Sequence, residues 1–287
     1  THDELLGCLR KLRLSGTAYN PAALIKSIPH LIRHIPGDPG DAHELLIALI
    51  NEVNTPLAQI FQGQMSSTVQ CSHCNKMTTT TDNMQDISLH IATDSSSPLP
   101  ERLYNFFQPE TLEDENAFWC EDCQKSRRAT KTLTYTHIPT ILIVHMKRLI
   151  LGGKIQNHIP FDTTLDMEPF MAPGLGSAQK LELIGMISHQ GTEEHGHYVA
   201  VTKKGEDWIL HNDASKTQIT PAHSHQSQAY IFIYRKTKPS TETETEISIT
   251  DTSQQPTEKL EPTYHGHNSL KRSPLHLDPP TTPYMEQ

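Results

Sequence analysis

Two pairs of cysteines, each with two residues between its members, are the side chains best suited to bind a metal. Cys71 and Cys74 form the first pair, and Cys120 and Cys123 form the second. A CxxC pair on a tight turn presents two sulfurs to one ion, and zinc takes four such ligands in a tetrahedron. Because strand-like sequence flanks both pairs, the pattern favours a structural zinc ion over a redox dithiol or unrelated buried cysteines. Four thiolates leave no open position, so we expect this zinc to stabilise the fold and do no chemistry.

A histidine and an asparagine form the second candidate group. His197 begins one predicted strand and Asn212 ends the next, with a Lys203–Gly205 turn between the strands. A hairpin of this kind places both side chains on one side, as a general base and the residue that orients it require. The same spacing also fits an ordinary surface contact between neighbouring strands, and these residues alone leave both interpretations open.

A nucleophile for such a base is missing from the sequence. Four of the 5 cysteines are assigned to zinc. The fifth, Cys8, falls on the apolar face of the first predicted helix, where a cysteine is usually a small buried hydrophobic residue. The sequence contains no Gly-x-Ser-x-Gly or P-loop pattern that would indicate another chemistry.

The elements that position these residues follow from the apolar pattern. Helical spacing predicts helices near residues 3–14, 22–28 and 41–50, with Asp41 as an N-cap and Glu44 at the capping-box position. Strand-like sequence begins after Phe61, and Ile87, Leu89 and Ile91 alternate as in a strand with one buried face. A short helix near 102–107 is followed by strands near 140–146, 181–187, 197–202, 208–211 and 230–234. This order predicts an α+β fold with helices first and an antiparallel sheet after them.

The composition restricts the partners and the compartment. The 287 residues carry 24 Lys+Arg against 33 Asp+Glu, and this formal charge of -9 disfavours nucleic acid. It suits a partner with a basic surface, or only keeps the protein in solution. No apolar run approaches the roughly 20 residues that span a bilayer, so no membrane association is expected. The odd cysteine count and the absent signal-peptide pattern predict an intracellular protein, in the cytoplasm, the nucleus or both. Residues 237–287 are predicted to be a disordered tail.

The motifs, taken in order, resemble those of the ubiquitin-specific proteases, a papain-like cysteine protease family. The resemblance runs from about Leu5 to Lys236. It rests on the helix start Asp41–Leu46, the two cysteine pairs, the segments Ile143–Leu149 and Ile187–Gly191, the box Gly196–Ala200, and the closing segments Trp208–Asp213 and Ala229–Tyr234.

This resemblance implies a catalytic domain over residues 1–236, with a helical thumb, an antiparallel palm and zinc-ribbon fingers at about 62–135. The implied activity is thiol-dependent hydrolysis of the isopeptide bond at the C-terminal glycine of ubiquitin. His197 would be the general base, Asn212 its orienting residue and Asp213 a supporting polar residue. The partners would be ubiquitin and ubiquitinated proteins, with the enzyme itself expected to be a monomer. The residues expected to contact ubiquitin are Asp41, Glu193, Glu194 and Tyr198.

The sequence also departs from the family pattern. The family's cysteine box, a Gly-Asn-Thr-Cys-Tyr-like segment, is not among these residues, so we expect an N-terminally truncated domain that cannot hydrolyse conjugates by itself. An inactive ubiquitin-binding pseudoenzyme or scaffold is the main alternative. A zinc-ribbon module unrelated to ubiquitin is a third, but it leaves the histidine box unexplained. Pro39-Gly40 before Asp41, and His211 before Asn212, are milder departures.

Overall fold

The computed structural model describes residues 2–15, 22–31, 40–52, 56–91, 96–150, 152–175, 179–193, 195–219 and 229–237. Apart from Thr237, the predicted tail at 237–287 lies outside the described residues, and so does Glu194. Among the described residues, no helix has both the length and the apolar character needed to cross a membrane.

The N-terminal quarter of the described chain is helical, as the sequence predicts. It holds α1 (His2–Ser15), α2 (Ala22–Leu31), α3 (Ala42–Glu52) and α4 (Pro56–Gln59). Asp41 caps α3, because its Oδ1 accepts the backbone N–H of His43 at 2.7 Å and that of Glu44 at 3.1 Å. These bonds satisfy two of the N–H groups that a helix start leaves open.

The larger sheet has eight strands in the order β15-β14-β13-β12-β16-β8-β3, with β11 paired to β12. The predicted antiparallel sheet is thus present, with one parallel pair, β3 and β8, at its end. The strands are β3 (Asp86–His90), β8 (Ile141–Lys147), β11 (Thr164–Asp166), β12 (Lys180–Gly191), β13 (Gly196–Lys204), β14 (Asp207–Asn212), β15 (Ser215–Ile219) and β16 (Ala229–Lys236).

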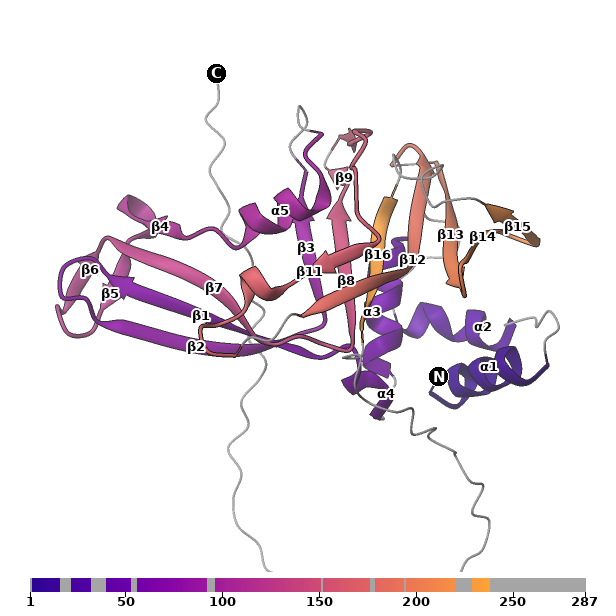
Figure 1. Ribbon diagram of the computed structural model, residues 1–287, viewed down its shortest axis with the longest axis horizontal. Coiled ribbons are helices and arrows are strands. Elements are labelled where there is room, and N and C mark those ends of the chain that lie inside the picture. The colour runs from indigo at the N-terminus through magenta and orange to yellow at the C-terminus, as the bar shows by residue number, and fades with distance from the viewer. Residues whose placement is uncertain are drawn as a thin grey trace, which may run out of the picture. The chain divides into compact units, whose positions relative to one another are not determined.

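A second sheet has four strands in the order β2-β1-β7-β4. Hydroxyl pairs join its first two strands, with Ser66 2.8 Å from Thr81 and Thr68 2.9 Å from Thr79. A two-stranded ribbon, β5 and β6, lies at the far end of these strands (Figure 1). The bounds are β1 (Gly63–Cys71), β2 (Met77–Met84), β4 (Glu110–Leu112), β5 (Phe118–Cys120), β6 (Lys125–Arg127) and β7 (Ala129–His137).

Both faces of the larger sheet are buried around β8 and β16. Val144 and Phe232 belong to the main core, whereas their neighbours Ile143 and Ile231 pack with Ile50 of α3. Successive side chains of a strand point to opposite faces, so one pair of strands supports two apolar layers. The main core also takes in α5 (Leu99–Phe106) and three alternating residues in and directly after β3, all buried as predicted: Ile87, Leu89 and Ile91. Helix α3, which Asp41 caps, therefore packs on β16.

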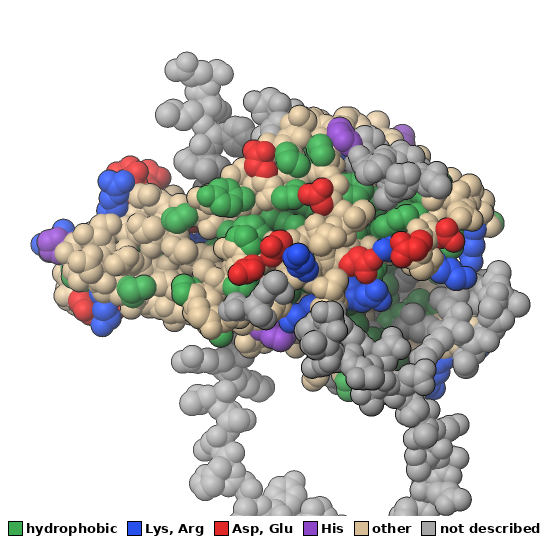
Figure 2. All heavy atoms as spheres, viewed as in Figure 1, with side chains coloured by type: hydrophobic (Ala, Val, Ile, Leu, Met, Phe, Trp, Pro, Cys, Tyr) green, Lys and Arg blue, Asp and Glu red, His purple; other side chains and the backbone are tan. Residues whose placement is uncertain are grey.

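Charged side chains are mixed on the face that Figure 2 presents. Acidic and basic groups lie side by side there, next to apolar side chains, and form no continuous field of one sign. A nucleic-acid surface needs clustered cations, and the described part of this face has no such cluster.

Candidate active site and metal centre

The histidine and the asparagine singled out in the sequence are in contact. Nε2 of His197 lies 2.7 Å from Oδ1 of Asn212. An amide oxygen only accepts hydrogen bonds, so Nε2 carries the proton. In the neutral imidazole Nδ1 is then the unprotonated nitrogen, which is the form a general base needs. The imidazole is partly exposed, at 44% of its side-chain surface, and is therefore open to a reacting group.

The hairpin of β13 and β14 brings the two residues together. Its register pairs Ala200 with His211 and Lys204 with Asp207, and Gly205 adopts φ +62° in the turn. Continuing that register places His197 two positions beyond the residue opposite Asn212, on the same face. Diagonal neighbours at this spacing are within reach of long side chains.

Asp213 lies at the edge of this pair. Its Oδ2 is 3.9 Å from Nε2 of His197, and 82% of its side-chain surface is exposed. It occupies the left-handed region with φ 49°, which aspartate tolerates better than most residues. A carboxylate that is this exposed and this far from the imidazole interacts with it only weakly.

The start of β13 packs against β12 and leaves no room for a side chain at Gly196. A Cβ at that position would lie 1.8 Å from Nε2 of His189. Gly191, which faces Gly196 in the register, has φ +96°, and a Cβ there would lie 2.3 Å from the carbonyl oxygen of His195. Both glycines are therefore required by the close approach of the two strands.

Asp41 has a second role besides the helix cap. Its Oδ2 accepts a hydrogen bond of 2.5 Å from the hydroxyl of Tyr230 in β16. A carboxylate has about four acceptor positions, and three are used by His43 N–H, Glu44 N–H and this hydroxyl. One acceptor position is therefore left over when only the described residues are counted.

Tyr198 joins the Asp41 region to β12. Its ring centroid lies 4.6 Å from that of His189 and 5.9 Å from that of Tyr230. Burial, with a smaller contribution from Asp41, raises the pKa of Tyr198 to about 12. Asp41, Tyr198 and the His197 strand thus form one continuous region of side chains. Glu193 lies apart from it, near Gly153, and its Oε2 is buried.

A polar group beneath α3 has metal-binding side chains but not the geometry of a metal site. Donor atoms of His43, Asp86 and His145 lie within 4.8 Å of one another. The two imidazoles stack at 3.9 Å with 11° between their planes. A metal must lie about 2 Å from nitrogen along its in-plane lone pair, so one ion cannot serve both rings as they stand.

The same group is instead a hydrogen-bond network. Oδ2 of Asp86 lies 3.0 Å from Nε2 of His43 and accepts the hydroxyl of Ser88 at 2.9 Å. Burial raises the pKa of Asp86, but His43 and Ser88 outweigh burial and hold it below its usual value. Burial, together with His43, lowers the pKa of His145 to about 4. The network ties the first turn of α3 to β3 and β8.

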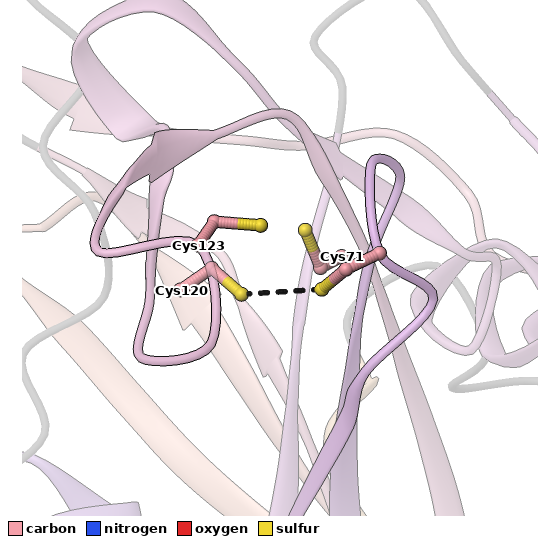
Figure 3. Close-up of side chains that lie close together, drawn as sticks. Cys71, Cys120 and Cys123 are labelled. Atoms are coloured by element: carbon pink, nitrogen blue, oxygen red, sulfur yellow. Dashed lines mark hydrogen bonds between the residues drawn. The ribbon is translucent and has the colours of Figure 1, made fainter.

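The four cysteines of the two CxxC pairs gather at the end of the second sheet. All four sulfurs lie within 4.8 Å of one another, and Sγ of Cys74 is 3.5 Å from Sγ of Cys120. Figure 3 shows the side chains of Cys71, Cys120 and Cys123 pointing toward a common centre from two facing turns. Four sulfurs at 2.3 Å from one ion would be about 3.8 Å apart, so the set fits a tetrahedral zinc ion with little adjustment.

The two turns that carry the cysteines have the same construction. Asn75 follows the first pair with φ 59°, and Gln124 follows the second with φ 49°. An ion pair joins the turns, with Nζ of Lys76 3.5 Å from Oδ1 of Asp122. A left-handed residue at this position reverses the chain after the second cysteine. The repeated turn brings the two sulfurs of each pair to the same side.

The four thiols lie close enough to change one another's pKa. Backbone N–H groups of Cys74 and His73 lower the pKa of Cys71 to about 7. Burial and the neighbouring sulfurs raise the pKa of Cys123 to about 12. Four adjacent thiolates repel one another unless a positive ion neutralises them, so the donor set matches what structural zinc requires.

Sequence reasoning missed Tyr230 as the partner of Asp41, and it missed His43 and Asp86 as the support of α3. Both pairs join residues far apart in the chain, separated by 189 and 43 positions. The only signal for the first was a tyrosine beginning a buried strand, which also fits an ordinary core residue.

A family model described as ubiquitin carboxyl-terminal hydrolase matches residues 3–234. Ubiquitin carboxyl-terminal hydrolase 25 of Arabidopsis thaliana is 36% identical over 166 residues, which cover 56% of this chain and 25% of the relative. Ubiquitin carboxyl-terminal hydrolase 36 of Drosophila ananassae is 31% identical over 219 residues, which cover 67% of this chain and 20% of the relative.

Solved structures with this fold include the SAGA DUB module containing Ubp8, bound to monoubiquitin. Its TM-score is 0.62 at 29% identity, and the match covers 70% of this chain and 49% of that one. The same module bound to ubiquitin aldehyde gives a TM-score of 0.62 at 28% identity, with 70% and 50% covered. The chain therefore spans about half of the solved chains and a quarter or less of the two curated relatives.

Proposed function

Because this chain belongs to the ubiquitin carboxyl-terminal hydrolase family, we propose that it is most of the catalytic domain of a deubiquitinase. The reaction is thiol-dependent hydrolysis of the isopeptide bond at the C-terminal glycine of ubiquitin. The nucleophilic cysteine belongs to a part of the protein outside these residues. The single observation that carries the proposal is the 2.7 Å contact between Nε2 of His197 and Oδ1 of Asn212.

Each residue of the pair has a defined role in this reaction. Nδ1 of His197 takes the proton of the thiol, and the thiolate attacks the carbonyl carbon of the terminal glycine. The imidazolium then protonates the leaving lysine amine, and a thioester remains. The same nitrogen deprotonates the water that hydrolyses the thioester and releases the thiol. Asn212 holds the ring in the required tautomer, and Asp213 is a supporting polar residue at its edge.

Asp41 and Tyr198 are proposed to bind the C-terminal tail of ubiquitin, with Glu193 and Glu194 bordering its path. The remaining acceptor position of Asp41 supports this role, because a carboxylate fits a basic tail through charge-assisted hydrogen bonds. Tyr198 lies between this carboxylate and β12, where its ring would form one wall of the channel. Ubiquitin and ubiquitinated proteins are the proposed partners of a monomeric enzyme.

Cys71, Cys74, Cys120 and Cys123 are proposed to hold one structural zinc ion. With four thiolate ligands such an ion supplies cross-linking and no catalysis. Residues 1–236 as one catalytic domain, with fingers at about 62–135, are proposed on the same basis. No disulfide joins the five cysteines, all of which lie in the described part of the chain; an intracellular location, in the cytoplasm, the nucleus or both, is part of the proposal.

A pseudoenzyme that binds ubiquitin without cutting it is the second candidate. It is favoured by the cysteine inventory, because four thiols form the metal cluster and Cys8 is buried in α1. His197 and Asn212 would then be retained without a nucleophile.

The complete natural protein, treated with ubiquitin that carries a cysteine-reactive C-terminal group, distinguishes the two candidates. Mass spectrometry then locates the labelled residue. Labelling at a cysteine outside this chain, lost in His197→Ala, is the result expected for a deubiquitinase. Tight binding without labelling identifies the pseudoenzyme, and neither binding nor labelling rejects both candidates.

A further inference from the structure

Strand β12 continues past Ser188, the last of its residues that pairs with the described part of β16. Strand β16 begins at Ala229, which pairs with Ser188, whereas β12 continues to Gly191. Carbonyl groups two residues apart in a strand point to the same edge, so those of His189 and Gly191 open to one side. A backbone carbonyl in a partly buried strand requires a hydrogen-bond donor. Among the described residues, no strand pairs with this edge of β12 beyond Ser188.

Lys154 supplies the missing donors. It ends a short hairpin formed by β9 (Leu149–Ile150) and β10 (Gly153–Lys154). Its Nζ donates to the carbonyl oxygen of His189 at 2.6 Å and to that of Gly191 at 3.3 Å. The side-chain amide of Gln156 donates to the same Gly191 oxygen at 3.3 Å. One ammonium group therefore bridges the two carbonyls.

These carbonyls belong to β12, which pairs with β13, the strand that carries His197. In the register of β12 and β13, Gln190 faces His197 and Gly191 faces Gly196. The turn between them is closed by Thr192 N–H donating to His195 O at 2.9 Å. Because neither Gly191 nor Gly196 has room for a side chain, we expect a displacement of the β12 end to move the start of β13, where His197 is the second residue.

We propose that Lys154 is a positioning residue for His197, which it acts on through the end of β12 and without contact to substrate. The inference rests on the proposed function, since it concerns the same reaction. The ammonium is the hydrogen-bond donor to His189 and Gly191, beyond the last described pair of β12 and β16. It thereby fixes the hairpin from which the imidazole of His197 reaches Asn212.

The cost of placing a cation here supports a specific role. Burial, with a smaller contribution from Arg148, lowers the pKa of Lys154 to about 8. An apolar residue at this position would avoid that desolvation, but it would remove the Lys154 donor from the carbonyl of His189 and leave Gln156 as the side-chain donor to Gly191.

The experiment uses the complete protein with ubiquitin that carries a C-terminal fluorophore as substrate. Lys154→Met keeps most of the side-chain stem and removes the donors, whereas Lys154→Arg keeps charged donors. We expect kcat to fall roughly 10- to 100-fold in Lys154→Met, as for other misplaced catalytic groups, with KM changed less than about threefold. Lys154→Arg should recover most of kcat. Lys203→Met is the matched control, because Lys203 is a half-buried lysine of β13 that pairs with Glu182, and it should retain wild-type kcat.

A second measurement separates positioning from general destabilisation. NMR of ¹⁵N-labelled imidazoles in this chain reports the protonated Nε2 of His197 that faces Asn212. We expect Lys154→Met to change this signal and Lys203→Met to leave it unchanged. Wild-type kcat in Lys154→Met, equal losses in both variants, or an unchanged His197 signal would overturn the proposal. A wild-type protein without hydrolysis would reject the proposed function instead, and the NMR comparison would still test the position of His197.

Discussion

The hydroxyl of Tyr230 donates a 2.5 Å hydrogen bond to Oδ2 of Asp41, across 189 positions of the chain. The bond joins the start of the last strand to the start of α3. It holds a carboxylate that already caps the helix, so one acidic side chain is fixed from both sides. The orientation of Asp41 toward a ligand therefore depends on a residue that sequence reasoning did not select.

Removing that hydroxyl should weaken ubiquitin binding. We expect Tyr230→Phe to lower the affinity for ubiquitin roughly 3- to 10-fold, the equivalent of one hydrogen bond of about 1 kcal/mol. Fluorescence anisotropy of labelled ubiquitin measures the change. Tyr234→Phe is the matched control, since Tyr234 lies in the same strand and donates to the carbonyl of Asp162 at 2.9 Å. Equal losses in the two variants would contradict a specific role for Tyr230.

We expect substitutions of His197, Asn212 and Asp213 to lower kcat by different amounts. In the complete protein, His197→Ala should lower kcat by roughly 10²- to 10⁴-fold, the usual contribution of a general base. Asn212→Ala should lower kcat with little change in KM, because it releases the ring without removing it. Asp213→Asn, which suits the left-handed backbone there, should change kcat less than about threefold because its carboxylate is exposed. A larger loss in Asp213→Asn than in Asn212→Ala would reverse the assigned roles.

Zinc removal should act first on the second sheet. We expect one zinc ion per chain by elemental analysis, and its loss in Cys71→Ser together with Cys120→Ser. Hydrogen exchange should then increase in β1, β2, β5 and β6 before it increases in β12 and β16, because local units open separately. Cys8→Ala is the control and should keep its zinc. A full zinc content in the double variant would reject this ligand set.

The buried imidazole of His145 predicts a loss of stability in acid. Its pKa is lowered from 6.5 to about 4, so between these values the unfolded chain binds more protons than the folded one. The stabilisation is therefore complete above pH 6.5 and decreases as the pH falls toward 4. The difference amounts to roughly 3 kcal/mol at most. Urea unfolding at several pH values should give a smaller acid loss in His145→Gln than in the wild type. His137→Gln, at an exposed position, should behave as the wild type does, and an unchanged acid loss in His145→Gln would contradict the assignment.

Local patterns in the sequence account for much of this fold. The helices of the first 60 residues, the Asp41 cap and the buried face of β3 all follow from residue spacing within one element. The cysteine pairs could be recognised because each pair is local, even though the site they form is not. The hairpin that joins His197 to Asn212 could be predicted for the same reason, since its turn lies between them.

What the sequence could not reveal depends on pairing between distant segments. The parallel contact of β3 with β8 is set by where the chain returns, not by the residues of either strand. Lys154 had no signal, because its proposed role depends on its contact with the end of β12, 35 positions away in the chain. His43 and Asp86 are ordinary polar residues until the packing of α3 on the sheet places them 3.0 Å apart.

The position of the cysteine pairs along the chain has a further consequence for how the protein folds. Cys74 and Cys120 are 46 positions apart, and the intervening segment includes β3, a strand of the other sheet. A cross-link around a loop of this length removes roughly 4 kcal/mol of chain entropy from the unfolded state. It also shortens the search that a parallel strand must make for its partner, which is intrinsically slow. Zinc binding would then shorten the search of β3 for β8, although none of the four cysteines lies in the larger sheet.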